Sequence, residues 1–73
     1  METQDWKASA KNILKAELAR KGVDYETLAQ KLQAIGVDES YNSINTKINR
    51  GAFTFSFFLQ CMEAIGVNNV RLG

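Results

Sequence analysis

Histidine and proline are absent from this 73-residue sequence, and Cys61 is its single cysteine. The absence of histidine removes the commonest general base and the commonest metal ligand. One cysteine cannot form a disulfide within the chain, and its place in the apolar run of residues 57–62 predicts a small buried hydrophobe. A reactive thiol is the alternative, which the lack of a neighbouring cation in the sequence disfavours.

Long apolar runs and catalytic motifs are missing as well. No stretch approaches the roughly 20 apolar residues that a membrane-spanning helix needs, and residues 1–5 are too polar for a signal peptide. We therefore expect a cytoplasmic protein without membrane association. The sequence has no Ser–His or Cys–His pair, no phosphate-binding glycine loop and no metal-ligand cluster. We expect no enzyme, no cofactor and no metal.

What the sequence does contain is a regular series of helical segments. Glycines at intervals of 14 or 15 residues divide the chain: Gly22, Gly36, Gly51 and Gly66. Glycine is common just past a helix end, where the backbone turns left-handed. Between the glycines, apolar residues recur at spacings of three and four, which predicts helices over residues 5–21, 25–35, 41–50 and 55–65. The chain is short enough for one domain, so we predict a compact all-α domain of four or five helices spanning residues 1–73.

Charge is distributed unevenly, although the net charge is only +1. The first segment is basic and carries a row of lysines at helical spacing: Lys7, Lys11 and Lys15. A solvated helix face is the simplest interpretation of this row. If the first helix lies beside the third, the row would instead contact phosphates. Four acidic residues would repel phosphate if they shared that surface: Asp24, Glu26, Asp38 and Glu39.

The segment over residues 41–50 is the strongest candidate for a functional surface. Ile44 and Ile48 face one way, and polar side chains that lack any carboxylate occupy the other faces: Asn42, Ser43, Asn45, Thr46, Lys47, Asn49 and Arg50. Asparagine pairs well with adenine and arginine with guanine, while hydroxyls bind phosphates or base edges. Asparagine is a poor helix former, yet three fall within eight residues. This pattern predicts a DNA-binding surface.

Residues from about 25 to 67 resemble the lambda-repressor-like helix-turn-helix domain. The matching segments are Leu28-Ala-Gln-Lys-Leu32, Gly36-Val37, Ile48-Asn-Arg-Gly51 and Ala64-Ile-Gly-Val67. The resemblance implies that helix 41–50 is a recognition helix that enters the major groove. The whole chain also resembles a small bacterial family of unknown function, through Arg-Gly-x-Phe followed by Phe-Phe-Leu-Gln-Cys.

Two features depart from the helix-turn-helix pattern. The spacing between Ile44 and Ile48 is four residues instead of the common three. The stretch from Leu28 to Ile44 is longer than usual. Either the second helix has an extra turn, or the connection over residues 36–41 is a longer loop. Either would change how the recognition helix is presented.

These observations predict a small bacterial transcriptional regulator that binds double-stranded DNA sequence-specifically. We expect a homodimer formed through the fourth helix and the C-terminal tail, residues 68–73, where Val70 and Leu72 alternate with polar residues as in a pairing strand. The alternative is a protein-interaction module that uses the phenylalanines of residues 53–58, since exposed aromatic side chains favour partner binding. We expect Phe53, Phe57 and Phe58 to seal the core.

Overall fold

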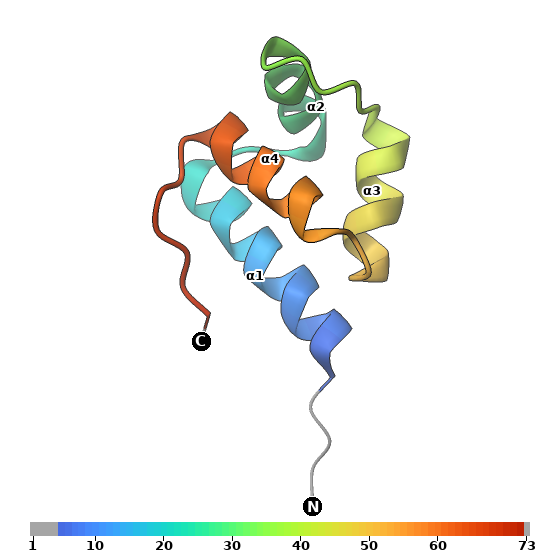
Figure 1. Cartoon of the computed structure of the whole chain (residues 1–73), viewed down its shortest axis with the longest axis vertical. Helices are drawn as coiled ribbons and strands as arrows, with labels where there is room; N and C mark the ends of the chain where they lie inside the picture. The colour runs from blue at the N-terminus through green and yellow to red at the C-terminus, as the bar shows by residue number, and fades with distance from the viewer. Residues whose placement is uncertain (1–4, 73) are drawn as a thin grey trace, which may run out of the picture.

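The computed structural model of this chain describes residues 5–72, and four helices form most of that part (Figure 1). Helix α1 spans Trp6–Lys21, α2 spans Tyr25–Ala34, α3 spans Tyr41–Arg50 and α4 spans Phe55–Ile65. Residues 5–72 contain no strand and no fifth helix, and the predicted all-α class with four helices is confirmed. None of these helices combines the length and apolarity needed to cross a membrane.

Each helix begins at a side chain that caps its backbone. The capping oxygens accept hydrogen bonds from the backbone N–H three residues further on and belong to Asp5, Asp24, Ser40 and Thr54. Such caps satisfy N–H groups that lack a partner inside the helix. At α3 the cap is reciprocal, because the Ser43 hydroxyl also accepts from the Ser40 N–H at 3.2 Å. The first turn of α3 is therefore fixed at both of these serines.

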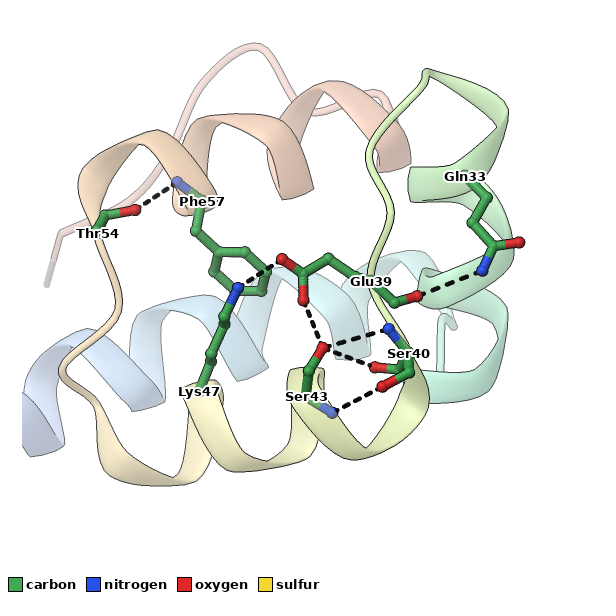
Figure 2. Close-up of polar contacts among 7 residues, drawn as sticks. All are labelled: Gln33, Glu39, Ser40, Ser43, Lys47, Thr54 and Phe57. Atoms are coloured by element: carbon green, nitrogen blue, oxygen red, sulfur yellow. Dashed lines mark hydrogen bonds and ion pairs between the residues drawn. The ribbon is translucent and has the colours of Figure 1, made fainter.

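The connection between α2 and α3 is a loop of six residues, 35–40. Because α2 ends at Ala34, the longer loop is the correct alternative and an extra helical turn is not. The loop is attached to α2 by Gln33, whose side-chain amide donates to the Glu39 backbone carbonyl at 3.4 Å (Figure 2). A helix-turn-helix motif usually has a turn of about three or four residues, so this connection is longer.

The core takes side chains from all four helices. Its buried members are Leu14, Leu18, Leu28, Ala29, Leu32, Ile44, Ile48, Phe57, Cys61, Met62 and Ile65. Helix α3 packs on α1 and α2, while α4 packs on the same two helices (Figure 1). Phe53 and Phe58 are half-buried against the core, so the expectation that they seal it with Phe57 is confirmed.

Cys61 lies in this core with no exposed surface. Burial, with a smaller effect of the Glu39 charge, raises the pKa of its thiol to about 12. The thiol therefore stays protonated at neutral pH and packs as a small hydrophobe. The reactive-thiol alternative is wrong.

The end of α3 is in direct contact with the start of α1. Gly51 follows α3 with φ of +66°, and a Cβ built on it would lie 2.1 Å from the backbone oxygen of Lys7. Glycine is needed here both for the left-handed backbone and for the space. This close approach places Lys7 beside the last turn of α3.

The C-terminal tail runs back along α1 (Figure 1). Its anchor is Glu17, which is 2% exposed and accepts from the Arg20 guanidinium and from the backbone of Arg71. The hydrogen bond from Arg20 lowers the pKa of Glu17 below its usual value, despite the opposing effect of burial. Val70 packs against the core next to this anchor.

The lowered pKa of Glu17 gives the first prediction. A carboxylate with a depressed folded pKa stabilises the fold above its unfolded pKa, roughly pH 4, and this contribution is lost as the pH falls through the folded pKa. We expect Glu17→Gln to unfold at lower urea than the wild type at pH 7, and the gap to narrow at pH 3. Amide exchange at Arg71 should also speed up in the variant. A gap of equal size at both pH values would contradict this role of the charge.

Candidate functional site

Helix α3 buries Ile44 and Ile48 and turns its opposite face to solvent. Its exposed side chains are polar or cationic at four of the predicted positions, Asn42, Thr46, Asn49 and Arg50, and Asn45 lies half-buried at their edge. The Asn49 amide donates to the Asn45 side-chain oxygen at 2.8 Å, which fixes the orientation of both amides. Each of these amides keeps donor or acceptor capacity beyond this bond. The face therefore offers hydrogen-bonding groups and a cation to a partner, without a carboxylate.

Ser43 and Lys47 lie on a different flank of α3, which faces Glu39 and α4 (Figure 2). The Ser43 hydroxyl donates to one Glu39 carboxylate oxygen at 2.5 Å, and Lys47 Nζ lies 2.5 Å from the other. Lys47 Nζ also sits 4.9 Å from the centre of the Phe57 ring. The structure thus separates these two side chains from the other five predicted site residues, and their polar groups bind within the fold.

Glu39 joins the loop before α3 to α3 itself. Its side chain is only 11% exposed. Burial raises the pKa of this carboxyl, but the hydrogen bonds from Lys47 and Ser43 outweigh that effect, so its pKa lies below the usual value. From the sequence alone, Glu39 is only a charge that could repel phosphate. In the structure this charge is neutralised by Lys47, and the pair holds α3 in place.

The lysine row of α1 lies beside α3, as the phosphate-contact interpretation requires. Lys7 and Lys11 line a shallow hollow together with Asn49 and Arg50. Asp5 also lines it, and its carboxylate caps α1 by accepting from the Ala8 N–H at 3.1 Å. Two helices thereby contribute three cations to one surface around the end of α3.

Lys15 lies at the other end of α3, where the charge is mixed. It shares a hollow with Tyr25, Tyr41, Asp24 and Glu26. The two tyrosine rings are 6.2 Å apart between centres, and Asp24 is occupied as the cap of α2, accepting from the Thr27 N–H at 2.8 Å. Asp24 and Glu26, two of the four acidic residues that could repel phosphate, therefore lie beside Lys15 of the lysine row. Positive charge is concentrated at the Arg50 end.

The side chains of this surface are of the kinds that can bind anions and base edges. Arg50, Lys7 and Lys11 can bind phosphate oxygens, and the amides of Asn42 and Asn49 can donate and accept together, as base edges require. Across residues 5–72, no three acidic or cysteine side chains gather in a way that could hold a metal ion. We define the α1–α3 polar face as seven residues of these two helices: Lys7, Lys11, Asn42, Asn45, Thr46, Asn49 and Arg50.

A family model described as a domain of unknown function, DUF6471, matches residues 6–70. This agrees with the resemblance of the whole chain to a family of unknown function. No curated protein and no solved structure matches the chain.

Proposed function

We propose that this chain, which belongs to the DUF6471 family, binds double-stranded DNA through the α1–α3 polar face. In this proposal α2 and α3 are the two helices of a helix-turn-helix motif, α3 enters the major groove, and the protein is a small cytoplasmic regulator of bacterial transcription. The observation that carries the proposal is that Lys7 and Lys11 of α1 share one surface with Asn49 and Arg50 of α3.

Phosphate contacts and base contacts would come from different residues of this face. The lysines of α1 reach the surface from beside α3, where they can position the protein on the phosphate backbone without reading sequence. The asparagines and Arg50 project from the exposed side of α3, where they can meet base edges. The Asn45–Asn49 hydrogen bond supports such reading, because an oriented amide loses less freedom on binding.

The long connection before α3 does not leave this helix loose. A tight turn normally fixes the second helix of the motif against the first. Here Glu39 takes over that task, since its backbone carbonyl accepts from Gln33 of α2 and its carboxylate binds Ser43 and Lys47 of α3. These contacts attach α3 to α2 and to the loop before it, which supports the presentation of its exposed face to a groove.

The test is binding of the whole chain to mixed-sequence duplex DNA, measured by fluorescence anisotropy at low and moderate salt. We expect salt-sensitive binding that Arg50→Ala and Asn49→Ala each weaken. On the duplexes of the mixture that bind most tightly the loss should reach about 5- to 150-fold, since one base contact is worth about 1–3 kcal/mol. Lys11→Ala should also flatten the salt dependence by about one unit of slope, as the loss of one phosphate contact does.

Asn12→Ala is the matched control for the amide substitutions. Asn12 is an exposed asparagine of α1 that lines a hollow with Arg20 and Arg71, away from the α1–α3 polar face. This variant should bind DNA like the wild type. Absence of binding at low salt would refute the proposal, and so would an equal loss of affinity in Asn12→Ala and Asn49→Ala.

A further inference from the structure

Four large apolar side chains of α1, α4 and the tail are exposed. Trp6, Phe55, Leu59 and Leu72 are 76%, 71%, 51% and 80% exposed. A shallow apolar groove accompanies them, lined mainly by Ala10, Ile13, Phe53, Phe55, Phe58 and Leu72. We call this groove, together with the exposed Phe55 and Leu59 of α4, the α4 apolar face. Small soluble domains rarely leave so many large apolar groups uncovered without an interaction partner.

The rings of this face form a preorganised stack. Phe58 lies between Phe53 and Phe55, with ring centres 6.5 Å and 6.1 Å away and the planes nearly parallel in both pairs. Phe53 also meets the buried Phe57 at 5.8 Å, which ties the stack to the core. Rigid aromatic side chains lose little freedom on binding, so they favour a protein partner.

The α4 apolar face lies on the other flank of α1 from the lysine row. Ala10 and Ile13 line the apolar groove, whereas Lys7, Ala8 and Lys11 line the hollow beside α3. A partner seated on the groove therefore leaves the α1–α3 polar face open. The two surfaces can be occupied together.

The exposed face of α4 has the pattern of a self-complementary contact. Phe55, Leu59 and Glu63 follow each other at intervals of four residues, all three are exposed, and Leu59 lies midway. Glu63 is the one charged residue of α4, and the first turn of the helix has no acidic side chain. If two α4 helices cross antiparallel at Leu59, the Glu63 carboxylate of each faces the positive N-terminal end of the other.

We propose that the α4 apolar face docks a second copy of this chain, with the two α4 helices antiparallel about Leu59. A two-fold contact requires that one surface complement itself. The row from Phe55 to Glu63 meets this requirement in shape, because Leu59 is central, and in charge, because the carboxylate meets the helix N-terminus. This inference does not depend on DNA binding, and its test contains no DNA.

The first experiment is sedimentation of the whole chain over a range of micromolar concentrations. We expect a reversible dimer, and Leu59→Glu should raise its dissociation constant at least about tenfold, since it places like charges at the two-fold axis. Glu63→Lys should weaken the dimer too, because a cation then meets the positive helix end. Leu59 is half exposed, so neither the fold nor the helix content should change in Leu59→Glu. A monomer at every concentration would overturn the proposal and leave the face to a different protein.

A crosslinking experiment tests the geometry itself. Leu59→Cys should form an interchain disulfide under mild oxidation, because two copies of residue 59 meet at the axis, while the buried Cys61 does not react. Ile35→Cys is the matched control, since Ile35 is also exposed, at 43%, but is the C-cap of α2 and does not line the apolar groove. Equal crosslinking of the two variants would overturn the antiparallel arrangement.

Discussion

Replacing Gly51 with alanine is expected to lower the free energy of unfolding by about 3–5 kcal/mol, the range reserved for severe steric changes. The new Cβ would lie 2.1 Å from the backbone oxygen and 2.7 Å from the backbone carbon of Lys7. Neither atom can move unless α1 moves away from α3. Of this expected loss, about 1–2 kcal/mol comes from placing an alanine in the left-handed backbone conformation. A domain of this size has a total stability of about 4–11 kcal/mol, so a large part of it would be lost. Urea denaturation followed by circular dichroism measures the change.

Gly22→Ala separates the two contributions. Gly22 has the same φ of +66°, but a Cβ there would find no atom within 4 Å. Its substitution should therefore lower stability by only about 1–2 kcal/mol, the effect of the backbone conformation alone. Equal losses in Gly22→Ala and Gly51→Ala would mean that α1 and α3 are not held in close contact at Lys7.

Lys47→Ala is the second substitution with a large expected effect, about 2–3 kcal/mol of lost stability. Removing the cation leaves Glu39, whose side chain is 11% exposed, without its ion-pair partner, and it removes the contact with the Phe57 ring. Because the pKa of Glu39 is lowered in the folded state, the stabilisation is present above the ordinary carboxylate range and is lost as the pH falls through the folded pKa. Denaturation should show a larger loss at pH 7 than at pH 3, where only the loss of the Phe57 contact persists once Glu39 is protonated.

Lys15→Ala serves as the control, since Lys15 is exposed and an ordinary surface substitution changes stability by less than about 0.5 kcal/mol. The affinity for DNA gives a readout of Lys47 that is independent of stability. Under conditions where Lys47→Ala and Arg50→Ala are both folded, Lys47→Ala should weaken DNA binding much less than Arg50→Ala, because Lys47 faces Glu39 and Phe57. Comparable losses would return Lys47 to the DNA-contacting set.

The helices could be predicted from the sequence because their signals are local. Caps, apolar spacing and terminal glycines act within a few residues, and the four predicted helices begin and end within one residue of the observed ones. The polar set on α3 was found for the same reason, because a helical wheel separates Ile44 and Ile48 from the rest.

The separation of Ser43 and Lys47 from the other polar residues of α3 could not be predicted, because it depends on contacts from distant parts of the chain. Ser43 and Lys47 are withdrawn from the exposed face by Glu39 in a loop and, for Lys47, by Phe57 in α4. The placement of Lys7 beside Arg50 likewise depends on how α1 crosses α3. Gly51 carries a signal for a helix end, but nothing in its neighbours along the chain shows that the backbone of Lys7 occupies the space next to it.

The buried cysteine allows conformational opening of the core to be measured on the native chain. Cys61 is fully covered, and the pKa of its thiol is about 12. An alkylating reagent can therefore modify this side chain only in molecules whose core has transiently opened. Where reclosing is faster than modification, the alkylation rate follows the population of open molecules, under native conditions and without an added label.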